Sequence, residues 1–354
     1  MPMARLRLCV LGAGSWVVKS HLPNLALRRD QVDFIGACRI GTDALEHLQR
    51  EWGFEEVSED YREILALAPD IVVVGSPAAL HYEHALAALE AGAHVLVEKP
   101  FTIRSADARA LVAAAAKLDR HLLVSFGYNY RPIVFKTRAH LQRIDGLGEI
   151  EFASVEMSSI TRDLLAGQGA YPLADALVRP EARTWADQSL SGGGYGQAQL
   201  SHALGVLLWL TSLRGDQVFS IKASTLGATV EHYLCGVVRY GGGAIGTISG
   251  SSAHAAAPGR DYLSVTVVGS LGELRMEFHN DVVRTYRVGR GNEVLELPPE
   301  AGRYDCDGPP NALVDLALGR VDASQSPGEL GVRTVEVLEA LYASSATGGP
   351  ATID

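Results

Sequence analysis

The segment Val10-Leu11-Gly12-Ala13-Gly14-Ser15-Trp16-Val17 decides the fold of the N-terminal part of the chain. It follows an apolar run directly and leads into a helix-like stretch, which is the order of a strand, a turn and a helix. Gly12 permits a tight turn, and Gly14 lets the backbone approach a pyrophosphate held at the helix N-terminus. Val17 stands where the usual pattern has a third glycine, so a glycine turn without a ligand is the alternative interpretation.

Short apolar runs alternate with longer amphipathic stretches through the first third of the chain. Stretches such as Tyr82–Glu90 and Asp107–Leu118 carry Ala and Leu at spacings of three and four, as helices that pack on a sheet do. Strands that alternate with crossover helices form a doubly wound parallel sheet, so we expect an α/β Rossmann dinucleotide-binding domain over residues 1–127. The expected strands are Leu6–Leu11, Phe34–Cys38, Ile71–Val74, His94–Val97 and Leu122–Phe126.

Long alternating runs dominate the chain after Arg131. With glycine turns at 240–243 and 269–272, they predict an α+β domain over residues 128–354 with a large, mainly antiparallel open sheet. A helix over Gly331–Ala346 closes the chain, and terminal helices can pack back on the first domain. Helices on one sheet face leave the other for a second subunit, so we expect a homodimer or homotetramer. The expected strands are Glu149–Ser159, Val218–Leu226, His232–Tyr240, Ala244–Ser252, Leu263–Val268 and Glu273–Phe278.

Composition and charge argue against several classes of function. The chain of 354 residues has a formal net charge of -10 and no dense block of Lys and Arg, which argues against nucleic acid as a partner. No apolar run approaches the roughly 20 residues of a membrane helix. The start of the chain lacks a signal-peptide pattern, so we expect a soluble, cytoplasmic protein. The four cysteines are scattered, so we expect neither disulfides nor a metal site.

The end of the second strand distinguishes NAD from NADP, because an Asp or Glu there accepts hydrogen bonds from the adenosine ribose. Here the run ends Gly36-Ala37-Cys38-Arg39. An arginine cannot accept those hydrogen bonds, but it can pair with a 2'-phosphate, so the sequence favours NADP over NAD as the cofactor. The alternative is that Arg39 is a solvated residue at a strand end.

Several motifs along the chain carry a resemblance to one family. They are Ser76-Pro77-Ala78-Ala79-Leu80-His81, Glu98-Lys99-Pro100, Gly127-Tyr128-Asn129-Tyr130-Arg131-Pro132, the glycines 192–194 before His202, and Ser326-Pro327-Gly328-Glu329-Leu330-Gly331. Over nearly the whole chain, the sequence resembles the Gfo/Idh/MocA family of glucose-fructose oxidoreductase and inositol dehydrogenase. The resemblance implies an NAD(P)-dependent oxidoreductase that transfers hydride between nicotinamide and a secondary hydroxyl or ketone of a sugar, cyclic polyol or sugar derivative. The residues it implies around the cofactor are Gly12, Gly14, Ser15, Trp16, Arg39, Ser76, Pro77, His81, Glu98 and Lys99.

The tripeptide Glu98-Lys99-Pro100 is the most specific of these motifs. The resemblance places Lys99 beside the nicotinamide and the reacting hydroxyl. A physical argument supports this catalytic role, because a lysine at the carboxyl end of a parallel strand points into the ligand crevice and stabilises a developing alkoxide. Glu98 either orients Lys99 and the backbone or has a purely structural role.

His202 matches the family's general-base histidine, and an ordinary imidazole pKa of about 6.5 suits proton exchange with a hydroxyl. Members of the family often carry aspartate four residues earlier, where this chain has Ala198. Gln199, at a spacing of three from His202, can hydrogen-bond the imidazole or the substrate but cannot act as a base. Tyr128 and Asp187 are further candidates for binding substrate hydroxyls, with ordinary core or surface roles as the alternatives.

The missing aspartate leaves two other functions open. One is a non-catalytic dinucleotide-binding regulator, although the presence of both Lys99 and His202 argues against it. The other is a redox-assisted sugar lyase or glycosidase that retains its cofactor and returns the hydride in each cycle. Arg179 and Arg183 leave open whether the substrate carries a phosphate.

Overall fold

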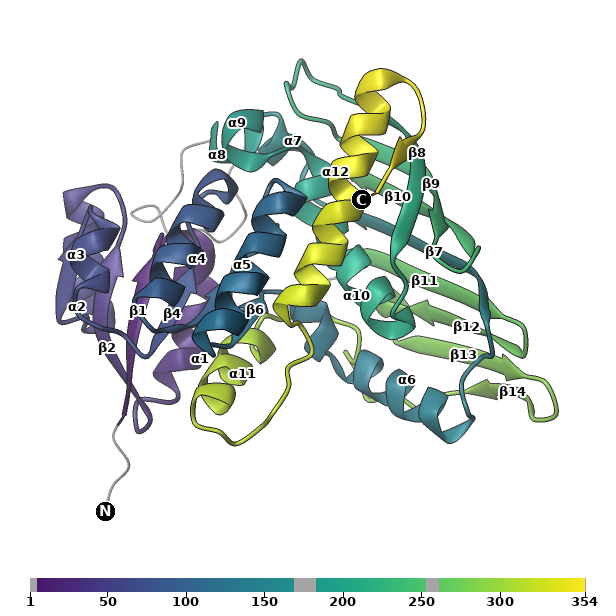
Figure 1. The fold of residues 1–354 in the computed structure, drawn as a ribbon, viewed down its shortest axis with the longest axis horizontal. Helices are drawn as coiled ribbons and strands as arrows, with labels where there is room; N and C mark the ends of the chain where they lie inside the picture. Colours follow the sequence, from purple (N-terminus) through teal and green to yellow (C-terminus); the bar gives the residue numbers. More distant parts are fainter. Residues whose placement is uncertain (1–4, 169–182, 253–260, 354) are drawn as a thin grey trace.

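Two sheets form the two halves of the molecule (Figure 1). The computed structural model describes residues 5–168, 183–252 and 261–353. Within these residues the first sheet has six parallel strands in the order β3-β2-β1-β4-β5-β6, with its switch point between β1 and β4. The predicted Rossmann fold is therefore confirmed. The strands are β1 (Leu6–Leu11), β2 (Val32–Cys38), β3 (Glu56–Ser58), β4 (Ile71–Val74), β5 (His94–Val97) and β6 (Leu122–Val124).

Helices cover both faces of this sheet, because its central strands are apolar on both faces. Leu8 and Val10 pack with α1, α2 and α11, whereas Cys9 and Leu11 share a core with α4 and α5. Helix α11 (Gly308–Ala317) comes from late in the chain and lies against β4, β5 and β6, and α12 (Gly328–Thr347) packs on α5 (Figure 1). The other helices of this half are α1 (Leu22–Ala26), α2 (Thr42–Trp52), α3 (Tyr61–Leu65), α4 (His81–Glu90) and α5 (Ser105–Leu118).

The glycine turn after β1 meets the end of β4 in close contact. Gly12 has φ +84°, and a Cβ there would lie 2.2 Å from the backbone nitrogen of Ser76. Val17 occupies the position of the missing third glycine and begins a π-helical turn, Val17–His21. Space for its side chain comes from Gly75, where a Cβ would lie 2.2 Å from Val17 Cγ2. The glycine that allows helix and strand to approach therefore lies on the strand side of the contact.

The second sheet has nine strands among the described residues, in the order β14-β13-β12-β11-β7-β10-β9-β8-β15. Its pairs are antiparallel except for β7 with β10, so the predicted mainly antiparallel sheet and both glycine hairpins are confirmed. The strands are β7 (Ile150–Ser159), β8 (Gly215–Ala223), β9 (Tyr233–Tyr240), β10 (Ile245–Ser252), β11 (Tyr262–Gly269), β12 (Gly272–Glu277), β13 (Val282–Arg287), β14 (Gly291–Val294) and β15 (Ala351–Thr352).

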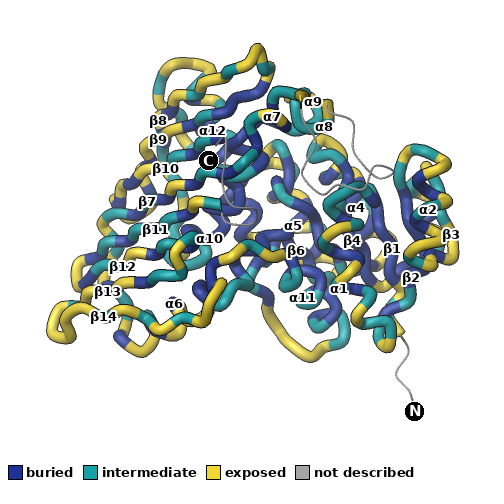
Figure 2. The backbone as a smooth tube through the Cα atoms, turned by 180° about the vertical axis from the view of Figure 1, so that it is seen from behind, coloured by how far each residue is buried: buried dark blue, intermediate teal, exposed yellow. Residues whose placement is uncertain are grey.

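Helices cover one face of this second sheet. Helix α10 (Ser201–Thr211) packs on β7 and β11, α12 packs on β8, and α6 (Pro132–Arg143) packs on β13. The opposite face carries exposed side chains along β8, β9 and β10 (Figure 2). Short helical segments lie between β7 and α10 in the chain: α7 (Arg162–Leu165), α8 (Arg183–Ala186), α9 (Gln188–Ser191) and the π-helical turn Gly196–Leu200.

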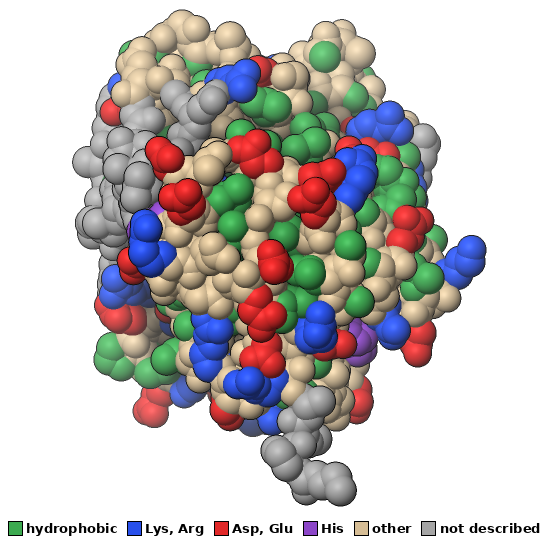
Figure 3. Space-filling view, turned by 90° about the vertical axis from the view of Figure 1, so that its left-hand side faces the viewer, with side chains coloured by type: hydrophobic (Ala, Val, Ile, Leu, Met, Phe, Trp, Pro, Cys, Tyr) green, Lys and Arg blue, Asp and Glu red, His purple; other side chains and the backbone are tan. Residues whose placement is uncertain are grey.

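Charged side chains of both signs share the surface at one end of the molecule. At the end shown in Figure 3, Lys and Arg side chains are interspersed with Asp and Glu. In the part of the chain that the structure describes, no helix combines the length and the apolar character needed to cross a membrane.

Candidate active site

A pocket of about 850 Å³ lies where the carboxyl ends of the Rossmann strands face the second half of the chain. All of the residues predicted to surround the cofactor line it: Gly12, Gly14, Ser15, Trp16, Arg39, Ser76, Pro77, His81, Glu98 and Lys99. Tyr128, Gln199 and His202, predicted to bind substrate or to act in catalysis, line the same pocket. The structure therefore brings together residues that are up to 190 positions apart in the sequence, from Gly12 to His202.

Asp187 requires a correction, because it does not line this pocket. Its carboxylate accepts hydrogen bonds from the backbone nitrogen of Ser189 at 2.9 Å and from the Ser189 hydroxyl at 2.7 Å, as the N-cap of α9. A capping aspartate and a ligand-binding aspartate look alike in a sequence. Arg183 does line the pocket, whereas Arg179 lies outside the described residues.

Lys99 follows β5 and reaches across to the second half of the chain. Its Nζ donates a hydrogen bond of 2.8 Å to the backbone carbonyl of Ala198. Burial lowers the pKa of Lys99, while the charges of Glu98 and Asp261 act in the opposite direction. The lysine therefore connects the Rossmann strand with the turn that precedes His202.

His202 lies buried at the start of α10, against two tyrosine rings. The ring centroids of Tyr128 and Tyr304 are 5.7 Å and 5.1 Å from that of His202, both in edge-on arrangements. No described residue hydrogen-bonds the buried Nδ1 of His202. Burial, followed by the charge of Lys99, lowers the pKa of His202 well below its ordinary value. The imidazole is therefore neutral, and a neutral imidazole has one ring nitrogen that can accept a hydrogen bond or a proton.

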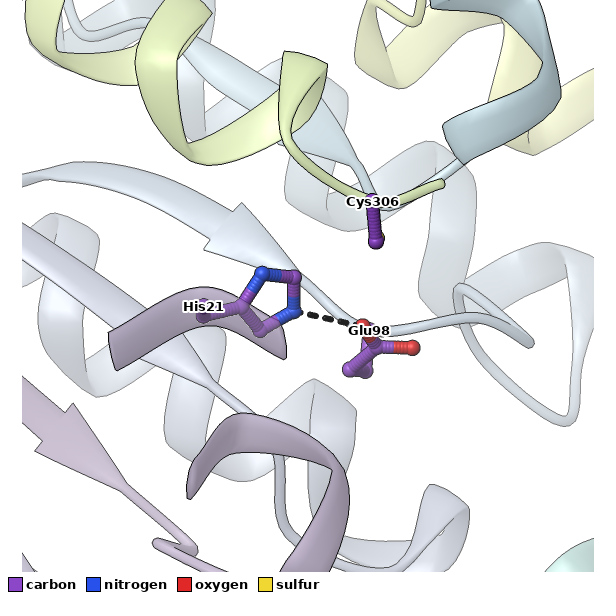
Figure 4. A group of neighbouring side chains, drawn as sticks. All are labelled: His21, Glu98 and Cys306. Carbon is purple, nitrogen blue, oxygen red and sulfur yellow. Dashed lines mark hydrogen bonds and ion pairs between the residues drawn. The ribbon is translucent and has the colours of Figure 1, made fainter. Parts of the chain in front are cut away.

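Glu98 is buried and hydrogen-bonded to His21 (Figure 4). Oε1 of Glu98 lies 2.6 Å from Nε2 of His21, and Oε2 accepts a 3.0 Å hydrogen bond from the backbone nitrogen of Lys99. Burial acts to raise the pKa of Glu98, but His21 and Lys99 outweigh it and the pKa is lowered. The ionised carboxylate thus fixes the backbone from which the Lys99 side chain extends.

Cys306 lies beside this pair, and its Sγ is 3.2 Å from the hydroxyl of Ser125. The side chains of His21, Glu98 and Cys306 place potential metal-ligand atoms within 4.8 Å of one another (Figure 4). However, the 2.6 Å between His21 and Glu98 is a hydrogen-bond distance, and two ligand atoms around one tetrahedral zinc ion lie farther apart than this. We therefore interpret the group as support for Lys99.

The glycine-rich turn before His202 wraps around a buried carboxylate. Glu231 accepts hydrogen bonds of 2.9 Å from the backbone nitrogens of both Gly194 and Gly196, and a 2.6 Å hydrogen bond from the hydroxyl of Tyr342. A Cβ on Gly194 would lie 2.0 Å from the Glu231 carbonyl oxygen, and one on Gly193 would lie 2.3 Å from the Tyr342 hydroxyl. The glycines are therefore required by the close approach of Glu231 and Tyr342, which position the turn.

Two charged side chains, Arg39 and Glu59, line the pocket near the ends of β2 and β3. The Nη1 of Arg39 donates to the carbonyl of Ala13 at 3.1 Å, and its Nε donates to the carbonyl of Ile40 at 3.2 Å. Glu59, which the sequence analysis did not select, also lines the pocket and accepts a 2.7 Å hydrogen bond from the backbone nitrogen of Gly41. Arg39 is therefore oriented toward the cofactor side of the turn and keeps guanidinium N–H groups for a ligand.

The residues fit a dinucleotide. Gly12 provides the close turn, Arg39 lines the pocket beside that turn, and the Ser76 hydroxyl is buried in the lining without a hydrogen-bond partner in the described ranges. Other pocket residues were missed by the sequence analysis because no motif marks them: Glu59, Thr161, Trp185, Asp261 and Tyr304.

Two sequence profiles match the chain. One, described as "Oxidoreductase family, NAD-binding Rossmann fold", matches residues 6–126, and the other, described as "GFO/IDH/MocA C-terminal domain", matches residues 168–275. The chain belongs to the Gfo/Idh/MocA oxidoreductase family. The resemblance that the motifs indicated is thereby confirmed.

Named members of the family resemble parts of the chain. It is 34% identical over 131 residues to the D-glucoside 3-dehydrogenase of Escherichia coli (strain K12), covering 37% of each protein. It is 32% identical over 127 residues to the scyllo-inositol 2-dehydrogenase (NADP(+)) IolW of Bacillus subtilis (strain 168), covering 36% of this chain and 34% of that protein. These alignments therefore span about a third of each of the two curated relatives.

A solved structure extends the likeness to the whole fold. Levoglucosan dehydrogenase in complex with NADH and levoglucosan superposes with a TM-score of 0.78 at 17% identity, over 99% of this chain and 100% of that one. At this identity the superposition shows a shared fold and does not by itself show a shared activity.

Proposed function

We propose that the protein is an NAD(P)-dependent dehydrogenase or reductase of a secondary hydroxyl or ketone on a sugar, cyclic polyol or sugar derivative. The observation that carries the proposal is the presence of Lys99 and His202 in one pocket with the glycine turn, joined through the hydrogen bond from Lys99 to Ala198. Relatives named as dehydrogenases of glucosides and inositols support the substrate class.

The reaction follows from the charges of the two residues. In the direction of oxidation, neutral His202 accepts the hydroxyl proton while the Lys99 ammonium stabilises the negative charge that develops on the oxygen. The bound dinucleotide supplies the acceptor for the carbinol hydride. Tyr128 and Gln199 line the same pocket and can bind other hydroxyls of the substrate. The same groups serve the reduction in reverse.

We assign NADP as the preferred dinucleotide. Support comes from Arg39, whose guanidinium is anchored to the carbonyl of Ala13 beside the glycine turn. A guanidinium binds a phosphate through paired charge-assisted hydrogen bonds, which a ribose hydroxyl does not offer. Glu59 also lines the pocket and is the carboxylate that would bind the ribose hydroxyls of NAD. Both dinucleotides therefore have to be measured.

We also infer that the protein assembles as a homodimer or homotetramer through the open face of the second sheet. Exposed apolar side chains gather there on neighbouring strands, at Phe219, Ile221, Val237 and Ile245, and Phe219 is paired directly with Val237. Unpaired apolar sheet faces are normally covered in solution. Light scattering on Ile221→Lys with Val237→Lys should then give a smaller mass than the wild-type protein.

The decisive experiment measures the absorbance of reduced nicotinamide in the purified protein with NADP and then NAD, against sugars, inositols and glycosides. Sugar-dependent reduction that is lost in both Lys99→Ala and His202→Ala is the expected result. If none of these compounds is oxidised while the dinucleotide stays bound to the protein, the redox-assisted lyase or the non-catalytic regulator would be favoured instead.

A further inference from the structure

An aspartate from the second sheet enters the pocket near Lys99 and His202. Asp261 immediately precedes β11 and lines the pocket together with both residues. Strand β11 pairs with β7 through Tyr262 and Ser158, and β10 pairs with β7 through Ser252 and Ser159. The ends of β7 and β10 and the start of β11 therefore lie at the same end of the sheet. Asp261, just before β11, reaches the pocket from this end of the sheet.

Among the described residues, the carboxylate of Asp261 accepts fewer hydrogen bonds than its two oxygens allow. Its Oδ2 accepts a 3.3 Å hydrogen bond from the hydroxyl of Tyr128, and within the described residues this is its one hydrogen bond. An ionised carboxylate has about four acceptor positions on its two oxygens. The Tyr128 ring also lies edge-on to His202, so the same tyrosine contacts both Asp261 and His202. A polyhydroxylated ligand beside His202 is thus within reach of an acceptor.

Asp261 also supplies a negative charge that position 198 lacks. The position four residues before His202 is Ala198, which contributes a carbonyl oxygen to Lys99 instead of a carboxylate. Asp261 and Lys99 interact electrostatically, and each shifts the pKa of the other toward its charged form. The pocket therefore retains a carboxylate paired in charge with Lys99, although it comes from a different element of the fold.

We propose that Asp261 is a substrate-binding residue that accepts hydrogen bonds from two neighbouring hydroxyls of the sugar, next to the carbon whose hydroxyl faces Lys99 and His202. This inference rests on the proposed function and specifies it, because it selects sugars and polyols with a free vicinal diol. A charged acceptor is a stronger hydrogen-bond partner than a neutral one, and its loss removes affinity for each hydroxyl that it binds.

Sugar binding measures this role separately from hydride transfer. The protein saturated with NADPH is titrated with methyl glucosides, inositols and their monodeoxy derivatives, and the quenching of tryptophan fluorescence is followed, since Trp16 and Trp185 line the pocket. Asp261→Asn should weaken binding of the best sugar at least about 10-fold. The matched change at exposed Asp322, Asp322→Asn, should alter it less than about 2-fold.

The deoxy sugars identify the hydroxyls. A deoxy derivative that lacks a hydroxyl bound by Asp261 should bind the wild-type protein about 10-fold more weakly than the parent sugar does. For the Asp261→Asn variant, the deoxy derivative and the parent sugar should have the same, weak affinity. Equal losses in both proteins, an unchanged affinity of Asp261→Asn, or no binding of any sugar would each overturn the inference. Binding that depends on Asp261 in a protein that transfers no hydride would reject the proposed function and leave the inference standing.

A second measurement needs no variant. Burial raises the pKa of Asp261 to about 6, and the titratable groups that interact with it are Lys99, Tyr128 and Tyr195. Wild-type affinity for the sugar should therefore rise as the pH increases from 5 to 7.5, because binding needs the ionised carboxylate. An affinity independent of pH over this range contradicts the proposal.

Discussion

The ammonium group of Lys99 donates its hydrogen bond to the backbone carbonyl of Ala198, 99 residues later in the chain. A backbone carbonyl is a neutral acceptor, so it orients the lysine without neutralising its charge. An aspartate at position 198 would offer a carboxylate one turn from His202. In this protein the turn before His202 therefore offers Lys99 a neutral acceptor, and the second sheet supplies a carboxylate to the pocket through Asp261.

Replacement of Lys99 by methionine tests this division of roles. Lys99→Met keeps most of the side-chain volume but removes the charge, so we expect kcat for sugar oxidation to fall about 100-fold or more. Binding of NADPH, followed by its fluorescence, should change less than about 3-fold. Lys117→Met, an exposed lysine on α5, serves as the control. Loss of NADPH affinity in parallel with kcat would contradict the catalytic role.

Arg39→Ala tests the choice of dinucleotide. Charge-assisted hydrogen bonds contribute about 1.5–3 kcal/mol, so the Kd of NADPH should rise roughly 10- to 100-fold while that of NADH stays nearly constant. Isothermal titration calorimetry measures both constants. Arg50→Ala, at an exposed position on α2, controls for the change in net charge. A parallel loss for both dinucleotides would show that Arg39 supports the turn and does not read the 2'-phosphate.

Glu231→Ala tests the support of the glycine-rich turn. The substitution leaves the backbone nitrogens of Gly194 and Gly196 and the hydroxyl of Tyr342 without their acceptor. Buried donors without partners each cost about 1–3 kcal/mol, so the free energy of unfolding should fall by roughly 3 kcal/mol or more in urea titrations. Tyr342→Phe removes one of these donors and should cost less. Equal effects of the two variants would refute the central position of Glu231.

Local patterns were sufficient to predict most of the fold. The apolar runs, the helical spacings and the glycine hairpins identify eleven strands that the structure contains, because burial on a sheet dictates the alternation. Strand β13 and the short strands β3, β14 and β15 were not predicted. Their pairing depends on neighbouring strands and not on their own sequence.

The site was predicted where motifs mark it and missed where the fold alone assembles it. Lys99 and His202 stand in recognisable contexts, and both line the pocket. Asp261 follows no motif and lies 59 residues after His202, so only the pairing of β11 with β7 brings it into place. Asp187 was a candidate for binding substrate hydroxyls, but its carboxylate caps α9.

The unusual ionisation of Asp261 predicts how stability depends on pH. Burial raises the pKa of Asp261 from its ordinary value of 3.8 to about 6 in the folded protein, so the folded state holds this proton more tightly than the unfolded state does. A raised carboxyl pKa stabilises the fold at low pH, and that stabilisation is lost as the pH rises through about 6, with a total change of roughly 3 kcal/mol.

Asp261→Asn has no such proton. Relative to the wild-type protein, the variant should therefore gain stability at pH 8, and roughly half of this gain should be gone at pH 5. Thermal unfolding at the two pH values measures the difference, with Asp322→Asn as the control that should follow the wild-type protein at both. A constant offset between Asp261→Asn and the wild-type protein from pH 5 to pH 8 would mean that Asp261 titrates normally.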